Sequence, residues 1–291
     1  MNLSSENFPQ RPAWTEIDLG KLRRNLQLIR GDLPKNVQLM AVVKDEAYGH
    51  GALDVARIAL EEGVWGFGLS TLEEAMTLRD AGITAPLLLL GERQEAELEW
   101  CVAHDLTVCV NEPNVVRALA KVAAKFSKQV PVHVKIHTGM SRYGVRWDEA
   151  LPLIEKIAAE KSLSLEGVMT HFSQSDEAEK TFANLQFARF NEVLDVLEKR
   201  KIPVKLRHTC NSGGFLDLPH THLDMVRVGI LLYGVFPSLV CRKIPGIEPV
   251  MTVKAKIAAI QKLKPGEVIG YGMRYTAARD RMIVFLGMCF C

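Results

Sequence analysis

The chain has 291 residues, of which 48% are hydrophobic and 24% are charged, and its 36 basic and 34 acidic residues leave a formal net charge of +2. This composition is typical of a soluble globular protein, and the length allows one large α/β barrel or two ordinary domains. The balanced charge argues against a nucleic-acid partner, and the absence of any run of about 18 uncharged apolar residues argues against a membrane span.

The polar N-terminus, MNLSSENFPQRP, lacks the apolar stretch of a signal peptide. Six cysteines stand at positions 101, 109, 210, 241, 289 and 291, without the paired spacing of a zinc site. The Cys289-Phe-Cys291 pair is too isolated to predict a site. We therefore expect a cytoplasmic protein with reduced thiols and no bound metal.

The predicted elements alternate between short β-rich runs and helical stretches. An extended segment at 13–19 and a helix at 20–29 come first. Eight apolar runs follow, at 39–43, 65–70, 86–90, 106–110, 132–136, 165–170, 204–209 and 223–228. Stretches of helical periodicity lie between them, at 52–63, 72–82, 115–126, 148–160 and 182–200. The switch between period 2 and period 3.6 predicts βαβ units and a parallel sheet.

Eight parallel strands with intervening helices favour a closed (β/α)8 TIM barrel over an open doubly wound sheet. We place this barrel, together with the N-terminal extended segment, at residues 1–240. Residues 241–291 contain short β-like runs, the turn KPGE and no long helix, which predicts the start of a β-rich domain. About 45 residues are few for a domain with its own core. The ending RMIVFLGMCFC has no turn or polar cap, so we expect this domain to be incomplete.

A barrel places its functional residues at the carboxyl ends of its strands, so the residues just past each run are the candidates. The run at 39–43 is followed by Lys44 and Tyr48. Later runs carry or are followed by further polar residues, namely Lys135, Arg142, His171, His208, Asn211, Ser212 and Arg227. The runs at 65–70, 86–90 and 106–110 are followed mostly by apolar or small residues. We therefore expect the titratable residues to gather on one side of the barrel mouth.

A strand that ends on a lysine usually just exposes the ammonium to water, and Lys44 has this simple explanation. The clustering of polar residues favours the alternative, a nucleophilic amine in a cleft. Carboxylates are scarce at these positions, which disfavours a metal-dependent aldolase or enolase. The backbone N–H groups of Gly213, Gly229 and Ile230, with the Ser212 hydroxyl, suit a phosphate at the last two strands. A lysine opposite a phosphate site suits a Schiff base to a phosphorylated aldehyde, and pyridoxal phosphate meets both demands.

Six motifs resemble those of bacterial alanine racemases in order and spacing: AVVKDEAYGHG, KIHTGMSRYGV, MTHFS, RHTCNSGG, DMVRVGILLYG and GYGMRYTA. The resemblance extends from about Trp14 to Ala277. It implies an eight-stranded barrel followed by a β domain, a head-to-tail homodimer and pyridoxal 5'-phosphate as cofactor. It also implies interconversion of L- and D-alanine, with D-alanine supplied for peptidoglycan.

The resemblance implies two catalytic bases on opposite faces of the substrate Cα–H bond, as racemisation requires. They are Lys44, which also holds the cofactor, and Tyr271, which reaches the active site of the partner subunit. Arg142 is implied to lie near the substrate carboxylate. Arg227 is implied to face the pyridine nitrogen, where a guanidinium does not hand over a proton.

The remaining implied roles concern the cofactor and its surroundings. Phosphate contacts are implied for Tyr48, Ser212, Gly229 and Ile230, and a cofactor contact for Asn211. His171 and His208 are implied to support the ring and Arg227, and Lys135 matches a lysine that is carbamylated in many members. Purely structural roles stay open: Tyr48 as a rim tyrosine, His171 and His208 as core histidines, Lys135 as a strand-end lysine, and Asn211 as a turn former.

Two departures from the family pattern bear on activity. Asp45 and Glu46 stand where a small residue and asparagine are usual, and their carboxylates would hinder turnover if they faced Lys44. After YTA the family continues through a Gly-Tyr-Ala-Asp-Gly motif and the rest of its β domain, so we expect impaired cofactor binding or activity. The alternatives to an alanine racemase are a racemase of broader specificity, a related decarboxylase, which would place an acid rather than Arg227 at the pyridine nitrogen, and a non-catalytic cofactor-binding barrel.

Overall fold

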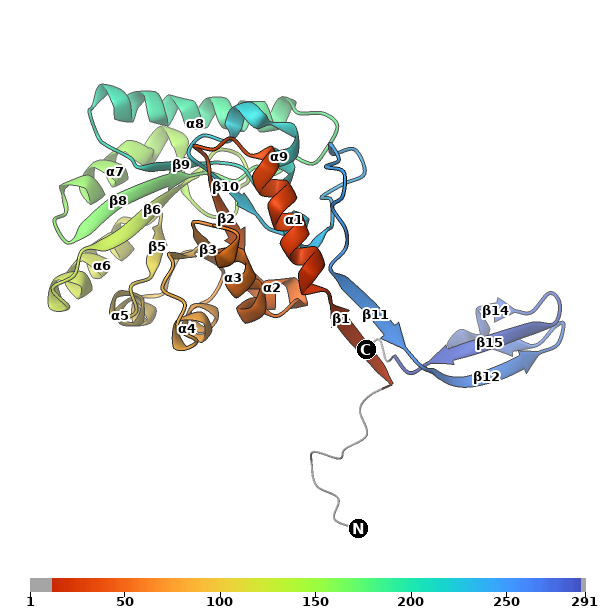
Figure 1. The fold of residues 1–291 in the computed structure, drawn as a ribbon. Helices are drawn as coiled ribbons and strands as arrows, with labels where there is room; N and C mark the ends of the chain where they lie inside the picture. Colours follow the sequence, from red (N-terminus) through yellow and green to blue (C-terminus); the bar gives the residue numbers. More distant parts are fainter. Residues whose placement is uncertain (1–11, 289–291) are drawn as a thin grey trace, which may run out of the picture. The chain divides into compact units, whose positions relative to one another are not determined.

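The structure, a computed structural model, describes residues 12–288 and contains two compact units (Figure 1). One unit comprises Leu19–Val250. The other combines the N-terminal residues up to Asp18 with the chain from Met251 onward. The cysteine pair at 289 and 291 lies outside the described residues.

The unit Leu19–Val250 is a closed barrel of eight parallel strands. They are β2 (Gln38–Val42), β3 (Gly66–Leu69), β4 (Leu87–Leu89), β5 (Thr107–Val110), β6 (Val130–His137), β8 (Leu163–Met169), β9 (Leu206–His208) and β10 (Met225–Val228). The order around the barrel is β5-β4-β3-β2-β10-β9-β8-β6, and a pairing of β5 with β6 closes the ring. The predicted (β/α)8 barrel is thus confirmed, with a strand at each of the eight expected runs.

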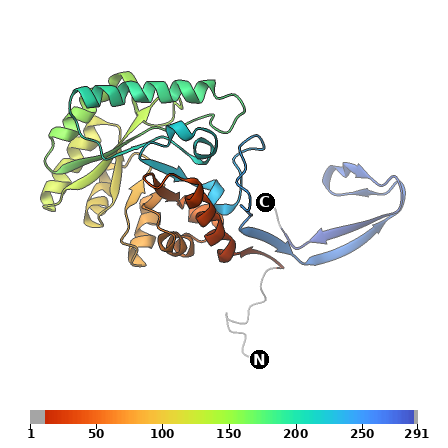
Figure 2. The same ribbon diagram turned by 45° about the horizontal axis from the view of Figure 1, so that its top comes forward.

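Helices cover the outside of the strands, as both ribbon views show (Figures 1 and 2). They include α1 (Leu19–Asp32), α3 (Ala52–Glu61), α4 (Leu72–Asp80), α6 (Pro113–Lys125), α7 (Ala150–Ala159) and α8 (Thr181–Lys199). A short helix that the periodicity did not predict, α5 (Leu98–Ala103), precedes β5. Helix α4 begins with a capping box in which Glu74 accepts hydrogen bonds from the Ser70 and Thr71 amides, and this ties the end of β3 to the helix.

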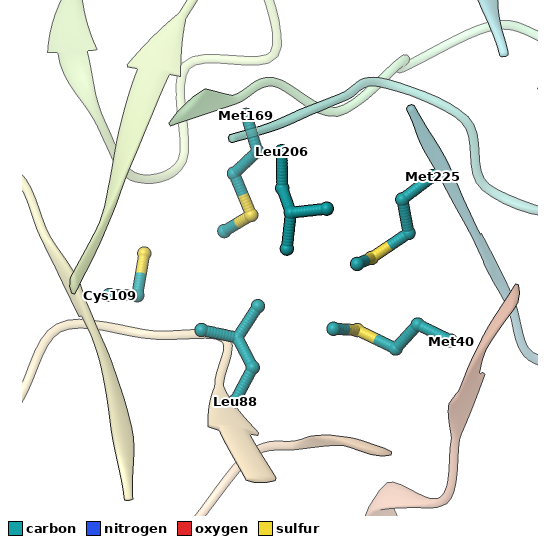
Figure 3. Packing of buried hydrophobic residues seen from close by; sticks show 6 residues of the cluster. All are labelled: Met40, Leu88, Cys109, Met169, Leu206 and Met225. Atoms are coloured by element: carbon teal, nitrogen blue, oxygen red, sulfur yellow. The ribbon is translucent and has the colours of Figure 1, made fainter. Parts of the chain in front are cut away.

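The barrel interior is filled by side chains rather than left as a channel. Six buried residues from six different strands point toward one another there: Met40, Leu88, Cys109, Met169, Leu206 and Met225 (Figure 3). Flexible methionine side chains suit an irregular barrel centre. Burial raises the pKa of the Cys109 thiol to about 12, so this cysteine is an apolar packing residue.

The second unit is built from antiparallel strand pairs. Strand β1 (Ala13–Ile17) pairs with β11 (Met251–Ala255), β12 (Ile257–Leu263) with β15 (Arg281–Leu286), and β13 (Val268–Ile269) with β14 (Tyr275–Thr276). The boundary at residue 240 remains a prediction. In the structure the N-terminal strand groups with the β-rich unit instead of the barrel, because its backbone hydrogen bonds go to β11. Across residues 12–288, no helix is long and apolar enough to cross a membrane.

Candidate active site

A cavity of about 620 Å3 lies at the carboxyl ends of the barrel strands. Ten of the predicted site residues line it: Lys44, Tyr48, Lys135, Arg142, His171, Asn211, Ser212, Arg227, Gly229 and Ile230. They follow β2, β6, β8, β9 and β10, or end those strands, as the barrel rule predicts. His208 is fully buried beneath, within hydrogen-bonding distance of Arg227. Tyr271 belongs to the β-rich unit, where its side chain is fully exposed, and its catalytic role remains a prediction.

The segment after β2 is a left-handed turn that periodicity cannot reveal. Four consecutive residues, 45–48, have φ between +53° and +56°, although none of them is glycine. Such backbone is strained for L-residues and persists only where surrounding contacts hold it. Here the Asp45 amide donates to Glu74 Oε1 at 2.6 Å, and the Ala52 amide donates to Glu46 Oε2 at 2.9 Å. Glu46 is therefore used as a backbone anchor and does not face the lysine.

The turn places Lys44 and Tyr48 close together at the cavity wall. The Lys44 Nζ lies 5.6 Å from the centre of the Tyr48 ring and 3.0 Å from Asp45 Oδ2. Of the two acidic residues that depart from the family pattern, Asp45 thus pairs with the lysine amine. Burial raises the pKa of Tyr48, against the opposing effect of Lys44.

The ends of β9 and β10 form a small cradle built from short side chains. The Gly229 amide donates to Ser212 Oγ at 3.1 Å, and a Cβ atom at Gly229 would lie 2.9 Å from Tyr48 Oη. A Cβ atom at Gly213 would lie 2.8 Å from Ser175 Oγ. Gly229 thus lies beside two hydroxyls, that of Tyr48 from the turn after β2 and that of Ser212 from the turn after β9. Because the Gly229 amide already donates to Ser212, it does not point freely into the cavity as we expected.

Asn211 supports this cradle from below. Its side-chain oxygen accepts hydrogen bonds from the Gly214 amide at 2.9 Å and from Ser175 Oγ at 2.7 Å. The structure therefore shows the turn-forming role for Asn211, as the cap of α9 (Ser212–Asp217), and leaves its cofactor contact a prediction.

Arg227 is buried at the cavity floor and held by several acceptors. Its guanidinium donates to His208 Nδ1 at 2.9 Å, to the Thr170 and Thr209 carbonyls at 2.8 and 3.0 Å, and to His171 Nδ1 at 3.2 Å. Burial lowers the pKa of Arg227 to about 10, so it remains charged at neutral pH. Burial and the charge of Arg227 lower the pKa of His171 well below its usual range, which keeps that ring neutral.

A chain of hydrogen bonds continues from Arg227 through the barrel. Because a guanidinium only donates, Nδ1 of His208 accepts and the proton lies on its Nε2. That nitrogen lies 2.8 Å from His133 Nδ1, and His133 Nε2 lies 3.2 Å from Glu166 Oε2. The donor direction is therefore uniform from Arg227 to Glu166, with both histidines neutral and opposite charges at the two ends. His133 and Glu166 were missed by the sequence analysis because they lie within strands, not after them.

The buried Lys135 shares the cavity with Arg142. Burial lowers the pKa of Lys135, and the nearby charges of Arg142 and Arg227 lower it further, against an opposing effect of Cys109. Its Nζ lies 5.2 Å from the centre of the Tyr143 ring. A lysine whose neutral form is favoured in this way is a suitable site for carbamylation, which remains a prediction.

The expectation that the runs at 65–70, 86–90 and 106–110 lead mostly to apolar or small residues is wrong for the second of them. Glu92 and Arg93 follow β4 and line the cavity. They stand as close to the end of their run as Asn211 and Ser212 do to theirs, so the same rule covers them, and they were overlooked in the sequence analysis.

The chain combines a barrel, a lysine at the end of its first barrel strand and a glycine cradle at the neighbouring strand ends. This is the arrangement of an enzyme of the alanine racemase type, and the family comparison agrees. The model "Alanine racemase, N-terminal domain" matches residues 17–237, and "Alanine racemase, C-terminal domain" matches residues 250–290. The chain therefore belongs to the alanine racemase family.

Curated relatives named alanine racemase support this membership. That of Carboxydothermus hydrogenoformans is 38% identical over 277 residues, which cover 95% of this chain and 75% of the relative. That of Desulforamulus reducens is 39% identical over 281 residues, with the same coverage of both chains. Among solved structures, an alanine racemase of Clostridium difficile 630 has a TM-score of 0.87 and 33% identity over 94% of this chain and 72% of its own. A histidine racemase of Leuconostoc mesenteroides has a TM-score of 0.82 and 26% identity over 96% and 75% of the two chains.

Proposed function

We propose that this protein is a pyridoxal 5'-phosphate-dependent racemase that interconverts L- and D-alanine. One observation carries the proposal: an amine, a hydroxyl-and-glycine cradle and a buried guanidinium share one cavity at the barrel mouth. Family membership supports the same reaction, and with it a cytoplasmic role in supplying D-alanine for peptidoglycan.

The cavity fits this cofactor at each of its polar ends. Ser212 and Tyr48 would contact the phosphate, and Gly213 and Gly229 let Ser175 and Tyr48 approach closely, where a Cβ atom would collide with those side chains. Ile230 offers a backbone amide at the start of η5 (Ile230–Tyr233) beside them. Lys44 would bond to the cofactor aldehyde from the neighbouring strand end, since its amine is only partly buried.

Arg227 would face the pyridine nitrogen, with His171 at the ring. When bound, the cofactor offers a conjugated ring that stabilises negative charge on the amino-acid Cα. Arg227 donates to this site without giving up its proton, because even its lowered pKa of about 10 lies well above neutrality. Arg227 would thus leave the pyridine nitrogen unprotonated, which would favour return of the proton to Cα over its transfer elsewhere.

Two groups would move the proton at Cα. The Lys44 amine would be one of them, on the face of the substrate nearest the end of β2. We assign the other to the partner subunit's Tyr271 in a homodimer. A base on each face is what inversion at Cα requires. Arg142 would hold the substrate carboxylate, with Lys135 beside it.

The test combines an absorbance scan with an L-to-D alanine assay on the purified chain. Protein loaded with pyridoxal 5'-phosphate should absorb at about 420 nm, as expected for a lysine Schiff base, and racemise alanine. Lys44→Ala should lose both properties, whereas Lys125→Ala, a change at an exposed lysine paired with Glu99, should retain them. An absorbance band that survives in Lys44→Ala would overturn the assignment of the lysine.

A further inference from the structure

The AVVKDEAYGHG motif contains a histidine that has no part in the proposed reaction. His50 does not line the cavity, although it stands two residues beyond the left-handed turn at 45–48. Gly49 and Gly51 on either side of it have φ of +82° and +86°, a backbone that glycine adopts without strain. With left-handed backbone on both sides, the His50 imidazole lies against the end of the turn.

The His50 side chain binds carbonyl groups of this turn. Its Nδ1 lies 2.9 Å from the Ala47 carbonyl oxygen and 3.1 Å from the Tyr48 carbonyl oxygen. Carbonyl oxygens only accept hydrogen bonds, so Nδ1 carries a proton and donates to both. The carboxylates of Glu46 and Glu74 bind amides around the same turn. His50 therefore complements them, because it satisfies acceptors of the strained segment where they satisfy donors.

An aromatic ring from η5 packs against His50. The centre of the Tyr233 ring lies 4.4 Å from that of the His50 ring, with 25° between the two planes, and 5.3 Å from that of the Tyr48 ring. Tyr233 is buried, and its hydroxyl donates to the Val42 carbonyl at 3.0 Å, at the end of β2. We refer to His50 and Tyr233 as the ring pair.

The ring pair holds the lysine segment at both of its ends. Val42, two residues before Lys44, is bound by Tyr233, and the carbonyls at the end of the turn are bound by His50. The short helix η5 that ends in Tyr233 begins at Ile230 in the cavity wall. The ring pair thus connects the segment that carries the lysine to the strand end that carries the phosphate cradle.

We propose that the ring pair positions the cofactor-binding lysine: His50 and Tyr233 hold the left-handed turn in the form that keeps Lys44 and Tyr48 at the cavity. This inference rests on the proposed function and adds two positioning residues to it. His50 acts through the turn and does not touch the reacting atoms. Because left-handed backbone is unfavourable for L-residues, a turn whose carbonyls lost their donor would relax, and the Lys44 amine would move with it.

The first test measures how fast pyridoxal 5'-phosphate reacts with the cofactor-free chain, from the absorbance at about 420 nm. His50→Phe keeps a ring that can stack on Tyr233 but removes the donor, and it should slow the reaction about tenfold. His50→Asn places an N–H at the position of Nδ1 and should largely restore the rate. As a control, His104→Phe makes the same exchange at a histidine stacked on Trp100 and should react at the native rate. A native rate in His50→Phe, or no recovery in His50→Asn, would overturn the inference.

Amide hydrogen exchange of the cofactor-free protein, followed by mass spectrometry, gives a readout that does not depend on the reaction. In His50→Phe, peptides that cover residues 44–51 should exchange faster than in the native protein, whereas peptides from α6 should exchange at the native rate. Faster exchange in both regions would indicate a general loss of stability and would overturn the positioning role.

Tyr233→Phe decides the matter if His50→Phe does not fold, because it keeps the stacked ring and removes only the hydroxyl bonded to Val42. It should slow the reaction with pyridoxal 5'-phosphate and speed exchange at residues 44–51, and native behaviour in both measurements would overturn the inference. If the native chain itself forms no Schiff base, the proposed function fails, and hydrogen exchange alone decides the inference. Faster exchange at 44–51 in the variants then supports it, and unchanged exchange overturns it.

Discussion

His208 Nε2 and His133 Nδ1 lie 2.8 Å apart in the barrel core, and this contact joins the cavity to a carboxylate on the far side of the sheet. The pair gives the buried Arg227 guanidinium an acceptor in His208 Nδ1 and ends at an acceptor carboxylate, so every buried ring nitrogen in this chain of hydrogen bonds has a partner.

Glu166→Leu should lower the free energy of unfolding by about 1–3 kcal/mol, because His133 Nε2–H would be left buried without an acceptor. Glu166→Gln retains an acceptor oxygen and should be less destabilising. Urea unfolding followed by circular dichroism measures both. As a control, Lys205→Ala removes only an exposed cation 3.7 Å from Glu166 and should change the free energy by less than about 1 kcal/mol. Equal effects of Glu166→Leu and Lys205→Ala would contradict the proposed importance of the hydrogen-bond chain from Arg227 to Glu166.

The free energy of unfolding should fall as the pH drops from about 7 to about 5. Burial lowers the pKa of His133, His171 and His208, whereas in the unfolded chain histidines titrate near about 6.5. Below about 6.5 the unfolded chain therefore binds more protons than the folded protein, and stability decreases with falling pH. Ion-paired carboxylates whose pKa is lowered, such as that of Asp224, reduce the free energy of unfolding further only at more acidic pH, where they become protonated. Urea midpoints at pH 8, 7, 6 and 5 test this, and midpoints that rise toward pH 5 would contradict it.

Asp45→Asn should speed the reaction of Lys44 with pyridoxal 5'-phosphate several-fold. The ion pair of Lys44 Nζ with Asp45 Oδ2 at 3.0 Å has to open before the amine bonds to an aldehyde, and asparagine lacks the charge while tolerating the left-handed backbone. Stopped-flow absorbance at about 420 nm measures the rate. Glu46→Gln serves as the comparison, because Glu46 anchors the Ala52 amide and should not affect the rate to the same extent. Equal rates for the native protein and Asp45→Asn would show that the ion pair does not restrain the lysine.

Ser212→Ala should weaken binding of pyridoxal 5'-phosphate about tenfold or more, because the hydroxyl is lost from the phosphate cradle and the Gly229 amide loses its acceptor. Gly229→Ala should weaken it further, since the added Cβ would lie 2.9 Å from Tyr48 Oη. Equilibrium titration of the cofactor measures both. Ser173→Ala, which removes a hydroxyl bonded to Gln186 away from the cradle, is the matched control. Unchanged affinity in both cradle variants would place the phosphate elsewhere.

The sequence predicts the barrel well because each strand is a short apolar run between amphipathic helices. It also predicts the residues at strand ends, such as Lys44 and Ser212, because the barrel rule assigns them one location. It does not reveal His133 or Glu166, whose importance depends on which strands are neighbours in the closed ring. Glu92 and Arg93 stand just after the run at 86–90, and they were overlooked although the same barrel rule covers them.

The left-handed turn at 45–48 is the feature that sequence periodicity could least predict, since its handedness is set by anchors from α4 and α3. Left-handed backbone costs about 1–2 kcal/mol per L-residue, so four residues require on the order of 4–8 kcal/mol from their surroundings. That is comparable with the net stability of a whole small domain, about 5–15 kcal/mol. The segment beside Lys44 therefore depends on its contacts with α3 and α4 for its native form. A change that loosens either helix would thus disturb the position of the amine without touching the cavity itself.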